Sequence, residues 1–416
     1  MKKLLFLLLV TLSVQLGAQN LEHYKKIIKE LSSEKYHGRG YAFDGANKAG
    51  KYLAKEMEKA GAQVTCQPFK LNINTFPSKM ELSIDGKKMV PGQDFTVREF
   101  NPSAKGEFKL YYIDTLNYNP DKIFADLESE EYKGAFIVCD FMFTYKHSKD
   151  FKKILSKDEC SCSGAIYTWD APLKFYKAYG EKVREKPVIW MSHDFPKDAK
   201  TVKVDMENKF LEGYECFNVI GKVEGKRHDS CYVFTAHYDH LGVLGKKTFY
   251  PGAHDNASGT AAIITLAEYY AKNQPEYDMY FVAFSGEDAN LWGSEWYAEH
   301  PMAPLSQIKY LFNLDMVADN NPVQYCEVSN EGVKGFELIE KIVAEKGYFK
   351  AMDRGELAAN SDHWPFAQRN VPCIFLENKD GDAFIYYHTI YDTYQTAKYS
   401  NYEPLFNLIK EFVKQY

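Results

Sequence analysis

Short apolar runs alternate with segments of helical periodicity from Phe217 to the end of the chain. After Asn256, apolar residues recur at intervals of three and four positions, and the same spacing returns over residues 405–412. The apolar runs between the helices are predicted strands, at residues 219–223, 231–236, 279–284, 309–314 and 372–376. This alternation predicts an α/β fold with a mixed, largely parallel central sheet and helices on both faces.

Two further helices are predicted near the N-terminus. Apolar residues keep helical spacing over 21–31, and a second helix runs from Asp44 to Ala60, where Gly61 stops it. A glycine-rich turn at residues 38–40 separates the two helices. Residues 62–71 then have the pattern of a strand.

Residues 76–209 have a different pattern. Strand-like runs at 108–113, 135–138, 164–167 and 188–191 are separated by charged loops, with little long helix. We interpret this segment as a β-rich accessory domain inserted between residues 20–75 and 210–416. The alternative is one continuous sheet through the whole chain.

Residues 1–19 are predicted to be a secretory signal peptide. Two lysines precede an apolar run over 4–14, and small residues follow at 16–19. A membrane anchor is the alternative, but the run is too short to span a bilayer. We therefore expect an exported protein, periplasmic or extracellular, without a membrane anchor.

Composition limits the classes of binding partner and the roles that the cysteines can have. The formal net charge of −6 and the absence of a basic stripe argue against nucleic acid or an anionic membrane as a partner. The eight cysteines are scattered without zinc-finger spacing. Cys139, Cys231 and Cys373 lie in apolar runs and are predicted to be buried thiols. Disulfide pairing and oligomeric state stay open.

Five stretches of the second half carry side chains that can bind metal: AHYDH (His237, Tyr238 and Asp239), GAHDNASG (Asp255), SGED (Glu287 and Asp288), LDM (Asp315) and YHTIYD (His388 and Asp392). Two histidines and three aspartates match the ligands of two metal ions that share one carboxylate, which leaves one glutamate as a base. Several of these residues directly follow predicted strands, and ligands gather at the carboxyl ends of strands in such sheets.

Each residue also has a plain structural interpretation when it is taken alone. Asp255 could cap the following helix, Glu287 and Asp288 could favour a first helical turn, and His237 could be a hydrogen-bonded residue at a strand end. Asp315 is harder to explain without a metal, because it ends an apolar run.

The ordered motifs AHYDH, PGAHDNASG, SGED, LDM and YHT-x-x-DT resemble those of the co-catalytic di-zinc exopeptidases, of the bacterial leucyl aminopeptidase and aminopeptidase Y type. The resemblance covers most of residues 20–75 and 210–416, and KGAFIVCD and CSGAIY in the insert resemble a protease-associated domain. It implies a metallo-aminopeptidase that hydrolyses peptide substrates with two Zn²⁺ ions, for which Mn or Co could substitute.

The resemblance also implies a role for each site residue. His237 and Asp315 would hold one ion, Asp288 and His388 the other, and Asp255 would bridge them. Further roles fall to Asp239, which would orient His237, to Glu287 as general base, to Tyr387, which would steady the tetrahedral intermediate, and to a cis peptide bond after Asp255. Two positions depart from the family pattern: Asp288 is more often Glu, and His254 is often Asp.

Three alternative functions stay open. The first is a glutaminyl cyclase, because the chain also resembles those enzymes, which share this fold and these ligand positions but use one zinc. A carboxypeptidase would need a basic residue such as Arg354 or Arg369 to bind the C-terminal carboxylate. Transferrin receptors resemble these peptidases but have a degraded metal site. A zincin is excluded because the chain lacks H-E-x-x-H, and no G-x-S-x-G supports a serine hydrolase.

Overall fold

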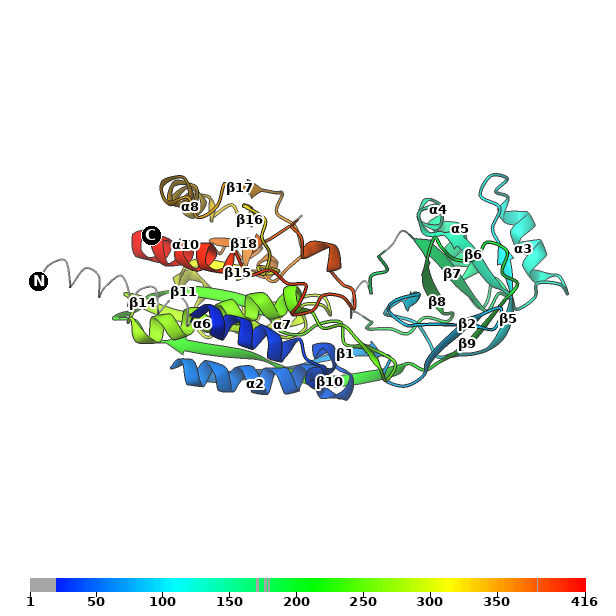
Figure 1. The fold of residues 1–416 in the computed structure, drawn as a ribbon, viewed down its shortest axis with the longest axis horizontal. Helices are drawn as coiled ribbons and strands as arrows, with labels where there is room; N and C mark the ends of the chain where they lie inside the picture. The colour runs from blue at the N-terminus through cyan, green and yellow to red at the C-terminus, as the bar shows by residue number, and fades with distance from the viewer. Residues whose placement is uncertain (1–19, 170–171, 176–177, 179, 380) are drawn as a thin grey trace, which may run out of the picture.

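Two bodies, each with its own sheet, lie side by side along the long axis of the molecule (Figure 1). The computed structural model describes residues 20–169, 172–175, 178, 180–379 and 381–416. The predicted signal peptide, residues 1–19, lies outside the described residues. Among the helices that are described, none combines the length and the apolar composition needed to cross a bilayer.

The larger body contains an eight-stranded sheet with four parallel strands at its centre. From one edge to the other, the strands are β1 (Gln63–Thr75), β10 (Lys209–Val223), β14 (Tyr277–Phe284), β11 (Arg227–His237), β15 (Ile308–Leu314), β18 (Cys373–Glu377), β16 (Val323–Val328) and β17 (Ala351–Arg354). The four central strands, β14 to β18, pair in parallel, whereas β1, β10 and β16 introduce antiparallel pairings. The predicted mixed, largely parallel sheet is confirmed.

Helices cover both faces of this sheet. On one face lie the helix over 20–31, α2 (Gly45–Ala60), α6 (Ser258–Lys272), α8 (Val333–Lys346) and α10 (Tyr402–Gln415). On the other face lie α7 (Trp292–Glu299) and α9 (Trp364–Ala367). Alternate residues of β11 join opposite cores, Phe234 the first and Val233 the second. Because both faces are covered, the central strands are almost continuously apolar in sequence.

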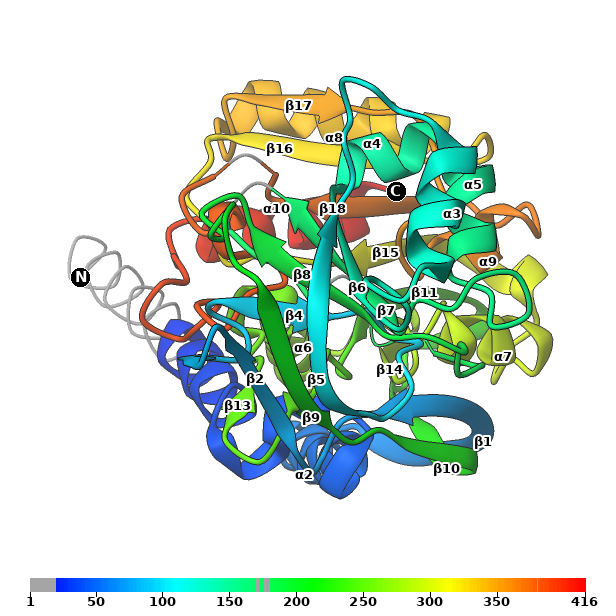
Figure 2. The ribbon, with the colours of Figure 1, turned by 90° about the vertical axis from the view of Figure 1, so that its right-hand side faces the viewer.

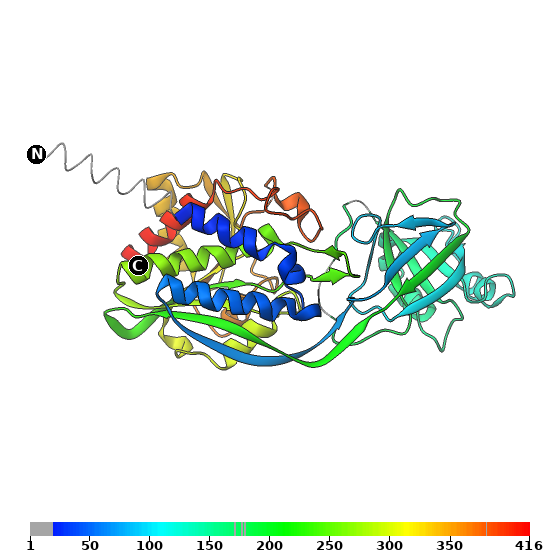
Figure 3. The same cartoon turned by 60° about the horizontal axis from the view of Figure 1, so that its bottom comes forward.

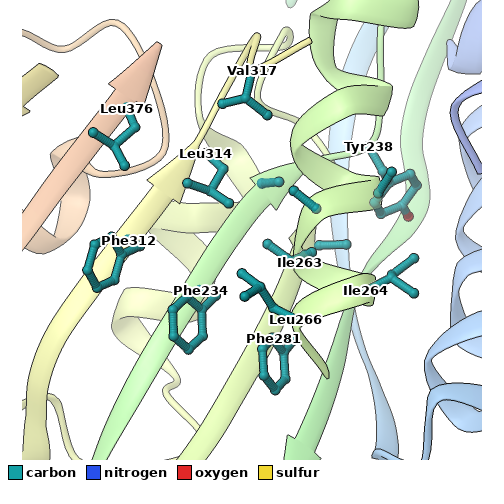
Figure 4. Close-up of a cluster of buried hydrophobic side chains, with 14 of the residues drawn as sticks. Phe234, Tyr238, Ile263, Ile264, Leu266, Phe281, Phe312, Leu314, Val317 and Leu376 are labelled. Atoms are coloured by element: carbon teal, nitrogen blue, oxygen red, sulfur yellow. The ribbon is translucent and has the colours of Figure 1, made fainter. Parts of the chain in front are cut away.

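The core beneath α6 is tightly packed. Figure 4 shows Ile263 and Leu266 of α6 close to aromatic residues of three neighbouring strands. The ring of Phe234 stacks between those of Phe281 and Phe312, with centroids 5.2 and 5.6 Å apart. These contacts fix the relative heights of β11, β14 and β15, and therefore the positions of the residues at their carboxyl ends.

The smaller body is the accessory body, and it contains a second eight-stranded sheet (Figure 2). Its strands follow the order β3 (Lys87–Met89), β2 (Met80–Ile84), β9 (Thr201–Met206), β5 (Ala104–Tyr112), β6 (Phe136–Asp140), β7 (Gly164–Trp169), β8 (Val188–Ser192) and β4 (Phe95–Val97). Three short helices pack on one face: α3 (Pro120–Glu128), α4 (Phe141–Lys146) and α5 (Ser148–Ile154). The other face has a separate core, which includes Leu244 and Tyr250 from the larger body.

A two-stranded ribbon connects the bodies. β1 and β10 pair antiparallel from Gln63 opposite Lys222 to Thr75 opposite Lys209, and both strands run from the larger sheet toward the accessory body (Figure 3). The small hairpin of β12 (Val243–Leu244) and β13 (Thr248–Phe249) also touches the accessory body, through the bridge between Phe76 and Leu244. All eight cysteines are free thiols, and the predicted burial of Cys139, Cys231 and Cys373 is confirmed.

Candidate metal centre

The candidate ligands meet at the carboxyl end of the larger sheet. His237 is the last residue of β11, Asp315 directly follows β15, and Asp288 lies in the turn after β14. Asp255 belongs to the short turn η3 (Ala253–Ala257) that leads into α6, and His388 follows the turn η5 (Phe384–Tyr386). Since β14, β11 and β15 are adjacent, their ends bring these side chains to one place.

The two carboxylate oxygens of Asp255 face two different sets of partners. Oδ1 lies 3.4 Å from Nε2 of His237, which is itself 3.2 Å from Oδ1 of Asp315. Oδ2 lies 3.1 Å from Nε2 of His388, which is 3.6 Å from Oδ1 of Asp288. The structure thus brings all five predicted ligands together and gives Asp255 the position of a bridge.

The chemistry of this cluster fits divalent cations. Asp255, Asp288 and Asp315 are 3 to 6% exposed. Burial acts to lower the pKa of His237, but the charges of Asp315 and Glu287 outweigh it and raise the pKa well above its usual value. Buried carboxylates need a compensating positive charge, and imidazole with carboxylate oxygens is a donor set that suits zinc.

Glu287 differs from the ligands because it is partly exposed. Its Oε2 lies 3.9 Å from Nε2 of His237, close enough to reach a group bound by that histidine. Burial raises the pKa of Glu287 well above its usual value, and the charge of Asp288 adds to this against the opposing effect of His237. A carboxyl group with a raised pKa beside such a cluster is suited to accept a proton and return it.

Asp239 contacts His237 differently from the expectation. The atom nearest to Nδ1 of His237 is the main-chain oxygen of Asp239, at 3.2 Å, whereas the carboxylate lies at 3.9 Å. That carboxylate accepts hydrogen bonds from the Tyr41 hydroxyl (2.7 Å) and from the backbone N–H of Glu287 (3.2 Å). Asp239 therefore orients His237 through its main-chain oxygen and positions the backbone of Glu287 through its carboxylate.

The loop of Asp255 is held by two buried residues: Arg39, to which the sequence analysis assigned no role, and Asp392, which it named only among the side chains that can bind metal. The guanidinium of Arg39, 0% exposed, donates to the main-chain oxygens of Leu31, Tyr238, Pro251, Gly252 and Asp255. The carboxylate of Asp392 accepts from the backbone N–H groups of His254 (2.8 Å) and Asp255 (3.0 Å). Both residues fix the backbone from which the bridging carboxylate projects.

The helix start after Asp255 is tied to the end of β15. Asn256, rather than Asp255, accepts the hydrogen bond from Gly259 N, so Asp255 is free of a capping role. The Asn256 amide also donates to the oxygen of Leu314 (2.9 Å). The peptide bond between Asp255 and Asn256 is cis, as the resemblance implied.

Two further polar residues contact the ligands of the cluster. The Ser361 hydroxyl donates to Oδ2 of Asp315 (2.8 Å) and accepts from the amide of Asn313 (2.8 Å). Nδ1 of His240, in the AHYDH motif, lies 3.0 Å from Oδ2 of Asp288. Ser361 and His240 therefore orient one ligand each. His240 stands in the AHYDH motif and Ser361 in none of the named motifs, so only the contacts in the structure assign a role to these two residues.

Tyr387 and His254 lie beside the centre. The ring of Tyr387 stacks on that of His388, with centroids 3.7 Å apart. Burial raises the pKa of its hydroxyl well above the usual value, and the charges of Asp255 and Asp288 add to the effect. The His254 side chain is fully buried, and its Nε2 lies 3.9 Å from the carboxylate of Asp319.

Known proteins of similar sequence are metallopeptidases. Residues 218–413 match the model of peptidase family M28. A probable zinc metalloprotease of Pyrenophora tritici-repentis is 37% identical over 106 residues, which are 25% of this chain and 22% of that protein. Aminopeptidase YwaD of Bacillus subtilis is 28% identical over 185 residues, 42% of this chain and 39% of that protein. The alignments thus span well under half of these curated relatives.

Solved structures share the fold over nearly the whole chain. A zinc aminopeptidase from Bacillus subtilis has a TM-score of 0.71 at 20% identity, with 95% of each chain covered. A peptidase M28 precursor from Shewanella amazonensis also has a TM-score of 0.71, at 16% identity, covering 97% of this chain and 95% of that one. The fold is that of these peptidases. The segment that matches the peptidase family M28 model, residues 218–413, carries all five candidate ligands.

Proposed function

We propose that this protein is a zinc-dependent aminopeptidase that removes N-terminal residues from peptides and holds two metal ions. The observation that carries the proposal is the position of Asp255, whose two oxygens face separate pairs of ligands at 3.1 to 3.4 Å. The aminopeptidase activity of similar proteins supports it.

The residues would act as follows. Two zinc ions at the cluster would supply Lewis acidity that activates a water molecule and polarises the peptide carbonyl. Glu287 accepts the proton of the attacking water and delivers it to the leaving amine, which its raised pKa allows. Tyr387 donates a hydrogen bond to the developing oxyanion. Asp239, Arg39 and Asp392 keep Glu287 and Asp255 in place.

The two arginines that a carboxypeptidase might use are engaged elsewhere. Arg369 pairs with Glu295 at 2.6 Å, between α9 and α7. Arg354 ends β17, at the edge of the sheet, with its guanidinium over the ring of Phe336. This favours attack at the amino terminus.

The test combines metal analysis with peptide hydrolysis by the purified protein. We expect about two zinc ions per chain, cleavage of leucinamide and of peptides with a free amine, and no cleavage of the N-acetylated peptides. Indifference to acetylation would reject the aminopeptidase. One metal ion together with pyroglutamate formation from N-terminal glutamine would instead support the cyclase.

Substitution of the base gives a sharper result. Glu287→Gln should reduce kcat by roughly 10²- to 10⁴-fold while the zinc content stays the same, because only the proton acceptor is lost. Glu299→Gln, an exposed residue of α7, is the matched control and should keep full activity. Full activity of Glu287→Gln would show that another residue is the base.

A further inference from the structure

A large cleft runs from the metal centre onto the accessory body. It has a volume of about 1310 Å³, and its lining includes Tyr387 and His388 from the larger body. The backbone N–H of Phe175, in the accessory segment, donates to the main-chain oxygen of His388 (3.0 Å), so the two bodies are in direct contact at this point. A molecule bound at the metal centre can therefore extend toward the accessory body.

The accessory wall of the cleft is aromatic. Phe141 lies against Trp169 and Trp190, with ring centroids 4.7 and 4.5 Å apart, and the two indoles are 5.9 Å apart. Trp190 is only 6% exposed, and its Nε1 has no hydrogen-bond acceptor among the described residues. The three rings therefore present an apolar aromatic surface to a group bound in the cleft.

The same wall is positively charged. Four cations line the cleft, Arg98, Lys152, Lys174 and Arg184, against one carboxylate, that of Glu185. The Arg184 guanidinium stacks on the ring of Phe100 at 3.6 Å, and no carboxylate of the described residues lies within salt-bridge distance of it. Burial, and then the charge of Arg98, lowers the pKa of Arg184, while the charge of Glu99 acts in the opposite direction.

The stacking on Phe100 leaves the edge of the Arg184 guanidinium for an anion. A planar guanidinium binds a carboxylate through parallel N–H groups in its own plane, and stacking on an aromatic face fixes that plane. Arg98 differs, because its guanidinium already donates to both oxygens of Glu99 (2.9 and 3.0 Å). Arg184 is therefore the cation of this wall best placed to hold a carboxylate.

We propose that this cleft selects short peptides that carry a bulky apolar side chain after the first residue and end in a free carboxylate, which Arg184 binds. The inference rests on the proposed aminopeptidase function and adds its substrate class. The first residue would lie at the metal centre, the apolar side chain against the wall of Phe141, Trp169 and Trp190, and the C-terminal carboxylate at Arg184.

The test measures kcat/KM for matched peptides of two to five residues that begin Leu-Phe, each as the free acid and as the C-terminal amide. At the length that spans the cleft, the free acid should be cleaved roughly 10-fold more efficiently than the amide, through a lower KM. Replacing Phe by Gly should lower kcat/KM. An amide whose last residue is Glu distinguishes a side-chain carboxylate from the chain end: restored cleavage assigns recognition to any carboxylate, and no restoration assigns it to the terminus.

Variants connect this preference to Arg184. Arg184→Gln should bring the ratio of acid to amide close to one, and Arg184→Lys should keep part of it, because the charge remains without the planar fork. Lys133→Gln, an exposed residue of the accessory body outside the cleft lining, is the control and should keep the wild-type ratio.

The two proposals fail in different ways. If the wild-type protein cleaves leucinamide but treats acid and amide within twofold at every length, the substrate inference is overturned and the aminopeptidase stands. If neither leucinamide nor any free peptide is cleaved by the zinc-loaded protein, the aminopeptidase itself is rejected. An unchanged ratio in a folded Arg184→Gln would also overturn the role of Arg184.

Discussion

Arg39 supports the centre without being a ligand. Its five hydrogen bonds all go to main-chain oxygens, from segments as far apart in sequence as Leu31 and Asp255. A buried arginine is costly unless its donors are satisfied, and here the backbone satisfies them. The guanidinium therefore connects the N-terminal segment to the loop of Asp255 through hydrogen bonds.

Replacement of Arg39 should lower both the stability of the fold and the affinity for zinc. Arg39→Met leaves five carbonyl groups buried without their donor, so we expect a loss of at least about 3 kcal/mol in the free energy of unfolding. Zinc affinity should fall as well, because Asp255 loses its support. Urea unfolding and zinc titration measure the two effects. Arg227→Met, an exposed residue paired with Asp229, is the control and should change stability by less than about 1 kcal/mol.

Ser361 offers a milder test of ligand orientation. Ser361→Ala removes the hydroxyl that donates to Asp315, and we expect zinc affinity to fall roughly 10-fold with little change in the fold. Competition with a chromogenic chelator measures the affinity. Ser83→Ala, in the accessory sheet, is the matched control. Equal affinities of the two variants would contradict a role for this hydroxyl at the metal centre.

The sequence reveals the residues of this site unevenly. The five residues that the structure brings together stand in short motifs at strand ends, so they could be named in advance. Arg39 could not, because arginine is normally exposed and its acceptors are backbone atoms that only the fold brings near. The sequence also could not predict that the Asp239 carboxylate lies 3.9 Å from His237 and accepts a hydrogen bond from Tyr41.

At the scale of elements, β16 shows where the hydrophobic pattern fails. This strand contains Gln324 and Glu327, both at most 1% exposed, and buried polar residues break the apolar run by which other strands were predicted. The helix α8 was also not predicted, although Phe336, Ile339 and Val343 have helical spacing. The central strands and α6 were predicted because both cores keep them apolar.

Glu327 links β16 to the segment that carries Ser361. Its carboxylate accepts from the Asn360 amide (2.6 Å) and the Ala358 backbone N–H (2.8 Å), and His363 lies 3.4 Å away. Burial acts to raise the pKa of Glu327, but these partners outweigh it, and the pKa lies below its usual value. The carboxylate therefore stabilises the fold above the pKa of the unfolded chain, about 4.3.

The lowered pKa of Glu327 predicts that the stability of the fold depends on pH. The stabilisation by Glu327 should be lost as pH falls through its lowered pKa, so Glu327→Gln should be less stable than the wild type at pH 7. The difference should shrink between about pH 5 and pH 3. Urea unfolding across this range measures it, with Glu337→Gln on the exposed side of α8 as the control. A difference that stays constant with pH would contradict the linkage.

At the scale of the whole molecule, the metal centre should stabilise the larger body. Without cations, the carboxylates of Asp255, Glu287, Asp288 and Asp315 face one another in a largely buried site. Ions that bind the folded chain alone stabilise it by mass action, and at 100 times the dissociation constant the gain is about 2.7 kcal/mol. Chelation should therefore lower the melting temperature by several degrees.

Calorimetry before and after chelation measures this shift. Added zinc should restore the original transition, whereas magnesium, which prefers oxygen ligands, should not. A melting temperature that does not change after verified metal loss would show that the fold does not depend on the ions.

The paired ends of β1 and β10 have an evolutionary consequence. Thr75 and Lys209 are cross-strand neighbours, so the chain departs for the accessory body and returns at a single rung of the ladder. A two-residue turn such as Asn-Gly could close that rung into a hairpin. The whole accessory body could thus be inserted or removed at this one position, and every strand of the larger sheet would keep its neighbours.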